Sequence, residues 1–504
     1  MKTSVAGMIK RTEWYRQGGA AVMWYVSPPW SIFTSLTVFG KRIPVTFRNM
    51  IGHNAKDFFT MYWTVPSMHR VAKFYIKKQL TDASFIKRLR CNWNRNVIPQ
   101  LDRMIDEIRS TDLRLLSEHE LTKLARRFVA QYRLAWSESI FHDAFDLVAT
   151  ELIRSEYLEN KNRVSQTSLE LLLAPTEPLV MQQEQFELAR LAQTAAHNRQ
   201  LARRIQIHAW KGLHIAFPKF FACVIQHQQR YFWMFNDYEH VVDIPTAAFL
   251  RRIRRLLQHS FDLRCDLKCI ESIRRSTSKK DRLMRALKLT PRQKALISLL
   301  TTIQIWRDER KAMSQRAHTV MRQFGKECMR RGGLPENELR CAFYWDWDKV
   351  LHPTAAFRKE LRLRTKGVVH RVERATRRTI AIGPICDSYK RLLDERIQKN
   401  DLRGMPAYTG IVRGKARIIL NQVDFPKFKI GDVLITPNTR PEYVQIMKKA
   451  SAIVTEEGGI TSHAAIVSRE LRIPAIVGVQ GVLEAFNNGD LIEVDAIQGT
   501  VIKL

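Results

Sequence analysis

The sequence predicts a multidomain chain, with a mostly α-helical N-terminal and central region followed by a C-terminal β/β/α domain. Glycine is the first indication, since ten of the 21 glycines lie in residues 404–504, whereas all eleven tryptophans and all seven cysteines precede them. Charge is the second, because the formal net charge is +34 but residues 404–504 carry eleven Lys/Arg and ten Asp/Glu. Two compositions this different indicate separately folded parts with a boundary near Arg403 and Gly404.

Residues 1–97 are rich in aromatic side chains. They are predicted to form an N-terminal region of mixed or irregular structure. Residues 17–40 contain no charged side chain over a length that resembles a membrane span. Pro28 and Pro29 interrupt this segment, and its β-branched and aromatic residues favour two short buried strands or an ordered coil around a Pro-Pro turn. A membrane span is the alternative. No secretory signal pattern follows Met1.

Residues 98–380 predict a basic helical domain. Apolar residues recur at a spacing of three to four in "NVIPQLDRMIDEIRS" and "SEHELTKLARRFVAQYRLAW". Ser117 and Glu120 form a capping-box pattern at the start of the second run. A further long helix is predicted to begin at the Thr290-Pro pair and to end at Gly332 and the glycine that follows.

Basic clusters recur in this domain at residues 251–255, 274–282 and 370–378. They indicate either a contact surface for nucleic acid or an anionic membrane, or solvated helix faces matched to an acidic partner. The sequence contains no evident helix-turn-helix, zinc-finger or RNA-binding motif, which favours the solvated faces. The aromatic stretch 227–240 has two interpretations as well, a base-stacking platform or, in preference, a core or pocket wall.

The cysteines predict neither a disulfide framework nor a metal site. Their number is odd and their spacing irregular, which fits a reducing cytoplasm. Cys265 and Cys269 are four residues apart on a predicted helix, but no second Cys/His pair nearby completes a zinc site.

Residues 381–403 are predicted to be a linker or hinge, and residues 404–504 alternate short β-rich runs with short helices. The runs "YTGIVRGKARIIL", "GDVLITP" and "ASAIVTEEGG" predict strands that end in turns. "RPEYVQIMKKA" and "SHAAIVSREL" predict helices, and "IPAIVG" and "DLIEVDAIQGTVIKL" predict further strands. The order of these elements predicts a compact β/α sandwich.

One histidine in this part of the chain lies at a position with chemical meaning. Gly458 and Gly459 predict a tight turn at a strand end, Thr461 or Ser462 is suited to cap the next helix, and His463 then falls in its first turn. Free backbone N–H groups and the helix dipole favour an anion there. Because a neutral imidazole is a nucleophile and its phosphorylated product is an anion, the position suits a phosphoryl acceptor. An incidental surface histidine on a capped helix is the alternative.

The stretch "GGITSHAAIVSRELRIPAIVG" closely resembles the phosphohistidine signature of the phosphoenolpyruvate-utilising enzymes. That family includes phosphoenolpyruvate synthase, pyruvate phosphate dikinase, the first enzyme of the sugar phosphotransferase system and rifampin phosphotransferase. "GMPAYTGIVRGKARII" and "GDVLITPNTRPEYVQIMKKASAIVT" extend the resemblance over residues 404–504. It implies a swivelling domain in which His463 is phosphorylated, Thr461 and Ser462 flank it, and the turn at Gly458 and Gly459 presents it.

Residues 306–350 resemble, more weakly, the helical region that precedes this domain in rifampin phosphotransferase-like proteins. Here "FYWDWDKV" replaces the usual Phe-Tyr-Leu pattern. Arg307, Arg310 and His370 are candidates for the side of the site that holds the phosphoryl acceptor. The alternative for each is a charged residue on a helix surface.

Two catalytic domains of the family are not expected in this sequence. Its ATP-grasp domain has glycine-rich strands with acidic magnesium ligands, and its phosphoenolpyruvate/pyruvate barrel needs eight βα units. Residues 1–403 are helical, basic and poor in glycine, and Leu504 follows the C-terminal domain directly.

The resemblance therefore implies a cytoplasmic phosphotransferase component that works with a partner. His463 is expected to be phosphorylated from ATP, or from phosphoenolpyruvate, bound with Mg²⁺ on a separate ATP-grasp-type subunit. It is then expected to pass the phosphoryl group to a small-molecule acceptor, with no tightly bound cofactor on this chain. The alternative is a non-catalytic scaffold that retains the swivelling domain, while its basic helical region contacts an acidic partner, nucleic acid or a membrane surface.

Overall fold

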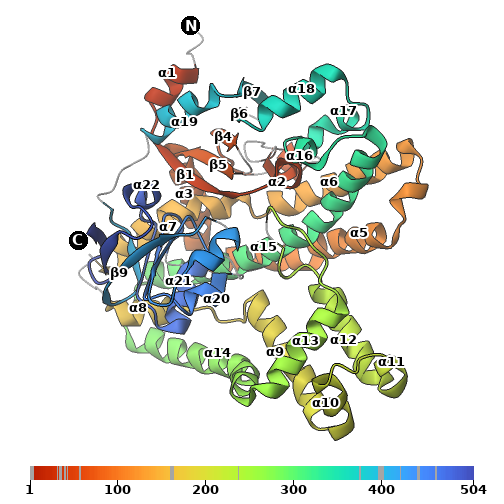
Figure 1. Cartoon of the computed structure of the whole chain (residues 1–504). Coiled ribbons are helices and arrows are strands. Elements are labelled where there is room, and N and C mark those ends of the chain that lie inside the picture. Colours follow the sequence, from red (N-terminus) through yellow and green to blue (C-terminus); the bar gives the residue numbers. More distant parts are fainter. Residues whose placement is uncertain are drawn as a thin grey trace.

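The computed structural model describes residues 5–504 except 31, 33–36, 39–40, 43, 56–57, 159–163, 237, 374–375, 396–401, 421, 440–442 and 460–461. Its described part is mostly helical and contains a five-stranded sheet, a seven-stranded sheet and a two-stranded ribbon (Figure 1). The long helix α15 (Pro291–Gly332) passes through the middle of the molecule. The predicted fold class, a helical chain with a β-rich C-terminal domain, is confirmed.

The five-stranded sheet is antiparallel and joins strands of the predicted N-terminal region to strands at the end of the predicted helical domain. Its order is β1 (Trp14–Ala20), β5 (Phe58–Thr64), β4 (Asn49–Ala55), β6 (Val368–Glu373) and β7 (Thr376–Ile382). Strand β4 pairs with β6 in a register that places Asn54 opposite Val368. The predicted boundary after residue 97 and the helical assignment up to residue 380 are therefore wrong. Buried apolar residues of β4 and β6 pack in the same sheet although they are far apart in sequence.

In its described part, the uncharged segment 17–40 contains the end of β1, the helix α2 (Met23–Trp30) and the two-residue strand β2 (Thr37–Val38), which pairs with β3 (Lys41–Arg42). Pro28 and Pro29 lie inside α2, which ends one residue later and is almost entirely buried. The helix α2 is a buried part of the fold. The prediction of two strands or a coil around a Pro-Pro turn is wrong at Pro28 and Pro29, because both lie in this helix. In the described residues no helix combines the length and the apolar character needed to cross a membrane.

The predicted linker at 381–403 contains the helix α19 (Cys386–Asp394). Cys386 and Leu393 are fully buried in an apolar cluster with Ile9, Trp14 and Ile51 of the N-terminal region. Residues 386–394 are thus held on the five-stranded sheet through burial of apolar surface, which differs from the linker or hinge that the sequence predicted. Residues 396–401 of the predicted hinge lie outside the described part of the chain.

Helices fill the space between the two large sheets. The predicted helix starts are found, since Ser117 caps α6 (Glu118–Ser137) in a capping box with Glu120 and Thr290 caps α15. The other α-helices around these, with the 3-10 helix η3, are α1 (Val5–Lys10), α3 (Val65–Thr81), α4 (Phe85–Asn92), α5 (Ile98–Ser110), η3 (Ile140–Ala144), α7 (Phe145–Ile153), α8 (Gln166–Leu173), α16 (Glu336–Leu339), α17 (Trp347–Leu351) and α18 (Ala355–Arg364).

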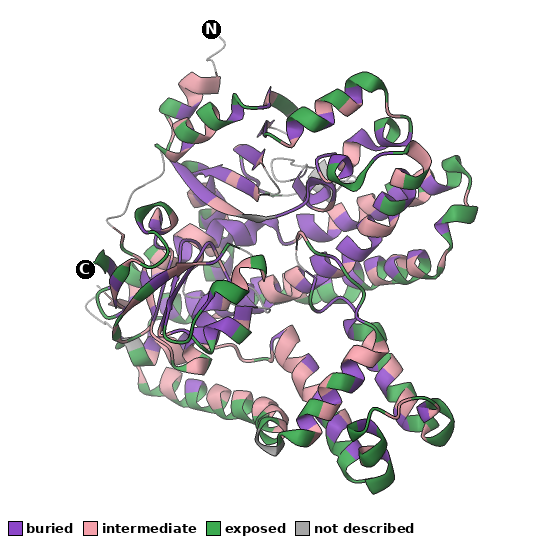
Figure 2. Ribbon diagram, in the orientation of Figure 1, coloured by how far each residue is buried: buried purple, intermediate pink, exposed green. Residues whose placement is uncertain are grey.

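A helical arm, residues 180–286, projects from this body (Figure 1). It consists of α9 (Val180–Ala196), α10 (Arg199–Gln206), α11 (Leu213–Ala216), α12 (Pro218–Tyr231), α13 (Thr246–Gln258) and α14 (Ser260–Ala286). Figure 2 shows buried residues concentrated between α15 and the sheets, whereas the far end of the arm is largely exposed.

The seven-stranded sheet forms the centre of the C-terminal domain. Its order is β14 (Thr500–Lys503), β13 (Leu491–Asp495), β9 (Ile411–Ile418), β10 (Val433–Thr436), β11 (Ala452–Thr455), β12 (Ala475–Val477) and β8 (Met405–Tyr408). Strands β9 to β12 are parallel, and β10 pairs with β11 so that Thr436 lies opposite Thr455. The carboxyl ends of β10 and β11 therefore lie side by side, which is where open parallel sheets place their functional loops. Helices α20 (Val444–Met447), α21 (His463–Leu471) and α22 (Val482–Ala485) complete the domain.

Candidate functional site

His463 is the first residue of α21, as the sequence predicts. The side chain of Ser462 caps the helix by accepting a hydrogen bond from the backbone N–H of Ala465 at 3.3 Å. Gly458 leaves β11 with a φ of +90°, and a Cβ there would lie 2.8 Å from the Cβ of Ser462. A glycine is required at that position because other side chains rarely adopt this backbone conformation. The turn and the cap together fix His463 at a helix N-terminus.

The imidazole of His463 is held in one orientation by the neighbouring loop. Its Nδ1 lies 2.8 Å from the hydroxyl oxygen of Thr439, which follows β10. When Nδ1 donates to this hydroxyl, Nε2 carries the free lone pair. Burial, with a smaller contribution from the charge of Lys311, lowers the pKa of His463 to about 3, although its side chain is only half-buried. The ring is therefore neutral at physiological pH and competent as a nucleophile.

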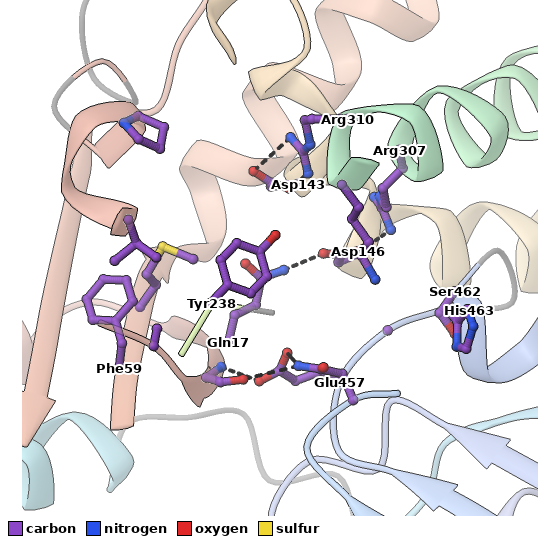
Figure 3. A pocket seen from close by; sticks show the side chains of 18 of the residues that line it. Gln17, Phe59, Asp143, Asp146, Tyr238, Arg307, Arg310, Glu457, Ser462 and His463 are labelled. Carbon is purple, nitrogen blue, oxygen red and sulfur yellow. Dashed lines mark hydrogen bonds and ion pairs between the residues drawn. The ribbon is translucent and has the colours of Figure 1, made fainter. Parts of the chain in front are cut away.

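His463 lines a cavity of about 220 Å³ between the C-terminal domain and the rest of the molecule (Figure 3). The polar residues of its wall are Gln17, Asp143, Asp146, Arg307, Arg310, Lys311, His318, Asn438, Thr439, Glu457 and Ser462. The apolar and aromatic residues are Ala21, Val26, Pro29, Trp30, Phe59, Met61, Tyr132, Trp136, Tyr238 and Ala464. Such a cavity suits a ligand that has an apolar body and a polar reactive end.

Three cations of α15 line the side of the cavity formed by the helical region. Arg307 donates to the carboxylate of Asp146 and, at 2.5 Å, to the carbonyl of His142. Arg310 pairs with Asp143 at 2.5 Å, and Lys311 follows it. Both arginines are thus held in place by ion pairs and hydrogen bonds within the protein.

Asp146 lies between the strand β1 and α15 in Figure 3. It accepts from Gln17 as well as from Arg307. Burial raises its pKa, and the positive charge of Arg307 opposes that effect. A buried carboxylate with hydrogen-bond donors on both sides is positioned to accept a proton from a ligand in the cavity.

The strand β1 and the loop after β11 hold the two sides of the cavity together. Glu457 accepts from the backbone N–H of Gly18 and, at 3.2 Å, from Asn438. The neighbouring Glu456 forms a buried ion pair with Arg16. Burial raises the pKa of Glu457 to about 8 and that of Glu456 to about 7, and Arg16 opposes the shift at Glu456.

The structure brings most of the predicted site residues together. Arg307 and Arg310 line the cavity with Gly458, Ser462 and His463. Gly459 packs against α7, because a Cβ there would lie 3.3 Å from the hydroxyl oxygen of Thr150. Thr461 lies outside the described residues.

The prediction for His370 is wrong in position. His370 lies in β6, where it is 3% exposed and its Nδ1 lies 3.1 Å from the hydroxyl of Thr379. Its ring packs edge-on against Phe343 at 4.4 Å. It does not line the cavity itself, but its ring packs edge-on at 5.8 Å against Trp30, which does.

Several cavity residues were missed by the sequence prediction. Asp143 and Asp146 are three residues apart in "HDAFD", a spacing that places two side chains on one helix face and was a usable signal. No local pattern indicated Gln17 or Trp30, because only the tertiary fold brings them to the site. Of the aromatic stretch 227–240, residues 231–234 are buried and Tyr238 lines the cavity, which agrees with a core and pocket wall.

Metal binding has no visible basis in the residues that the structure describes. No group of three His, Cys, Asp or Glu side chains there is arranged to hold a metal ion. The seven cysteines are all free thiols, and Cys265 and Cys269 lie on α14.

The fold and the site define a β/α domain that presents a histidine at a helix start, next to the ends of parallel strands. Residues 428–499 match the family described as "PEP-utilising enzyme, mobile domain". The C-terminal part of the chain is therefore similar to the mobile domain of the phosphoenolpyruvate-utilising enzymes.

Curated relatives match the same part of the chain. A probable phosphoenolpyruvate synthase of Pyrococcus horikoshii is 49% identical over 102 residues, which is 20% of this chain and 12% of that protein. A probable phosphoenolpyruvate synthase of Staphylothermus marinus is 50% identical over 104 residues, again 20% of this chain and 12% of the relative. The uncharacterized phosphotransferase YvkC of Bacillus subtilis is 40% identical over 108 residues, 21% of this chain and 13% of the relative. The chain thus spans about an eighth of the length of the relatives that it matches.

The raised pKa of Glu457 predicts that stability falls with pH between about pH 5 and about pH 8. The folded state retains this proton up to about pH 8, whereas the unfolded chain releases it near its ordinary value of 4.5, so rising pH favours unfolding across that window. Glu457→Gln, which carries no titrating proton, should remove a slope of about 1.4 kcal/mol per pH unit, which amounts to a few kcal/mol over the whole window. Free energies of unfolding from denaturant titrations at several pH values measure the slope. Equal slopes in both proteins would show that Glu457 titrates normally. Glu395→Gln, at an exposed site, is the control.

The hydroxyl of Thr439 is expected to fix the tautomer of His463. Thr439→Val removes this hydrogen bond while conserving side-chain shape, so the imidazole should become a mixture of the two neutral tautomers. Nitrogen-15 chemical shifts of selectively labelled histidine report the tautomer directly. Thr439→Ser, which keeps the hydroxyl, should retain the native spectrum. An unchanged His463 spectrum in Thr439→Val would show that another group orients the ring.

Proposed function

We propose that the protein is a phosphotransferase component in which His463 is transiently phosphorylated and passes the phosphoryl group to an acceptor in the cavity. The observation that carries this proposal is that His463 and the fixed arginines of α15 line one cavity. The printed names of the relatives, phosphoenolpyruvate synthase and phosphotransferase, support phosphoryl transfer as the chemistry of the shared domain.

The transfer takes place in two displacements at phosphorus. In the first, Nε2 of His463 attacks the donor phosphoryl group, so that a P–N bond forms and the P–O bond to the donor breaks. In the second, an oxygen of the acceptor attacks, the P–N bond breaks, and the electron pair returns to Nε2. The proton of the acceptor hydroxyl passes to Asp146, which lines the same cavity. Arg307 and Lys311 balance the charge of the phosphoryl oxygens.

The acceptor is expected to be a small molecule with an apolar or aromatic body and a hydroxyl group. Trp30, Phe59, Trp136 and Tyr238 supply apolar surface on the wall of the cavity, while Arg307 lies on its polar side. Binding of the apolar body would orient the hydroxyl towards His463 and would exclude water from the transferring group.

The donor is proposed to be ATP, or phosphoenolpyruvate, bound with Mg²⁺ on a separate ATP-grasp-type subunit. In the described residues before β8, the long strands form only the antiparallel five-stranded sheet. A phosphoenolpyruvate barrel needs eight parallel strands, and that arrangement does not occur among these residues. The C-terminal domain must then leave the cavity to reach the donor and return to it with the phosphoryl group.

Phosphorylation of His463 tests the carrier function directly. The full chain should take up label from phosphoenolpyruvate, or from ATP labelled at the β and γ positions with an ATP-grasp partner, and it should react with phosphoramidate without any partner. The label should be stable in base, labile in acid, and absent from His463→Ala. His259→Ala, at an exposed histidine, is the matched control. Label that persists in His463→Ala, or no label from any of the three donors, would contradict the proposal.

Arg307 should matter for discharge of the phosphohistidine. Protein phosphorylated with phosphoramidate is mixed with a panel of hydroxylated aromatic compounds, and loss of the phosphoryl group is followed by mass spectrometry. Arg307→Met should slow discharge by about 100-fold, because one fixed charge on the transferring group is lost. Arg307→Lys should retain part of the rate, and Lys326→Met, an exposed site on the same helix, should keep all of it. Discharge at the wild-type rate in Arg307→Met would show that Arg307 only supports the fold.

A further inference from the structure

The far end of the helical arm is a surface with no part in the proposed phosphoryl transfer. It comprises residues 198–221, which include α10, α11 and the start of α12, and we refer to it as the arm tip. Figure 1 places α10 and α11 on the side of the arm that points away from the two large sheets, and Figure 2 shows this region largely exposed. Leu201 and Ile205 are buried and anchor α10 in the arm.

The positive charge of the arm tip is not balanced by acidic residues in the same stretch of sequence. Residues 188–236 contain no Asp or Glu and seven Lys or Arg. Five of these cations lie on the tip and are exposed, namely Arg199, Arg203, Arg204, Lys211 and Lys219.

Their surroundings differ from those of other cations on the arm. Nearer the body, Arg252 pairs with Glu184 at 2.6 Å and Arg230 pairs with Glu187 at 2.9 Å. Within the described residues, none of the five tip cations forms an ion pair with a carboxylate. Their charge is therefore available to an external anion.

Apolar side chains are exposed among these cations. Ile207 follows α10 and is 64% exposed, and Ile215 in α11 is 76% exposed. Trp210 lies between them and is half-buried. Large aliphatic side chains surrounded by unpaired cations, with a tryptophan beside them, are the combination that binds to the interface of an anionic bilayer.

We propose that the arm tip docks on an anionic phospholipid surface. The five cations bind headgroup phosphates, while Ile207 and Ile215 insert between headgroups to a shallow depth. The exposed cations of the arm tip favour a negatively charged partner. The exposed aliphatic side chains favour a bilayer over nucleic acid. Single-stranded nucleic acid is bound chiefly by exposed aromatic rings that stack on bases, and Trp210 is half-buried. The arm would hold the protein at a membrane surface, where an apolar acceptor is concentrated.

Co-sedimentation of the full chain with vesicles tests this proposal. Vesicles that contain phosphatidylglycerol should bind the protein, and vesicles of phosphatidylcholine alone should not. Arg203→Gln combined with Arg204→Gln should weaken binding by about 25-fold, since each cation near an anionic surface contributes about fivefold. Lys326→Gln combined with Lys359→Gln removes two exposed cations from the body and is the matched control, with little change expected.

The apolar contribution is separated in the same assay. Ile207→Gln combined with Ile215→Gln should weaken vesicle binding about tenfold or more at constant charge. Leu115→Gln combined with Ile430→Gln, at residues that are 83% and 85% exposed on the body, should have no effect. Equal binding by tip and control variants would overturn the proposal, and so would failure to bind anionic vesicles. Tight binding to single-stranded RNA without vesicle binding would assign the surface to nucleic acid instead. None of these outcomes depends on phosphorylation of His463.

Discussion

The position of the C-terminal domain depends on one buried guanidinium, that of Arg16 in β1. It pairs with Glu456 after β11, with Glu484 in α22 at 2.7 Å and with Asp394 in α19 at 3.3 Å. A buried charge is costly unless it is paired, so Arg16 stabilises the structure only while all three elements meet around it. The next two residues of β1, Gln17 and Gly18, line the cavity that contains His463. Docking of the domain and assembly of the site are therefore one event. Any swivelling of the domain must separate Arg16 from Glu456 and Glu484 together.

Local sequence determines much of the C-terminal domain. Strand ends, the turn at Gly458, the cap at Ser462 and the start of α21 at His463 were all predictable, because each depends on residues a few positions apart. The starts of α6 and α15 were predictable for the same reason. A helix start with a histidine in its first turn also indicated the chemistry proposed for the site, since the backbone N–H groups that favour an anion belong to the helix itself.

The opposite wall of the cavity was not predictable from local patterns. It combines Gln17 of β1, Asp146 of α7, Tyr238 of the arm and Arg307 of α15, which only tertiary packing brings together. The prediction of a helical domain up to residue 380 failed for the same reason. Strand β6 pairs with β4 across more than 300 residues, and the periodicity of a sequence carries no information about so distant a pairing partner. Segment 17–40 shows the limit of propensity, because Pro28 and Pro29 disfavour a helix interior and so predict strands or coil. They lie in the last turn of α2, where Trp30 ends the helix one residue later.

The same electrostatics that keep His463 neutral have a consequence for a swivelling carrier. Lys311 opposes a positive charge on the imidazole, and with Arg307 it favours a negative charge at the same place. A phosphorylated His463 carries that negative charge, so the docked position binds the loaded domain more favourably than the unloaded one. Transfer to the acceptor removes the charge and with it part of the docking free energy. The docking contacts that remain include those of Arg16 and of Glu457, whose pKa of about 8 keeps its carboxyl largely protonated at neutral pH. In the proposed cycle, phosphorylation of His463 would thus favour docking of the domain, and loss of the phosphoryl group would favour its release.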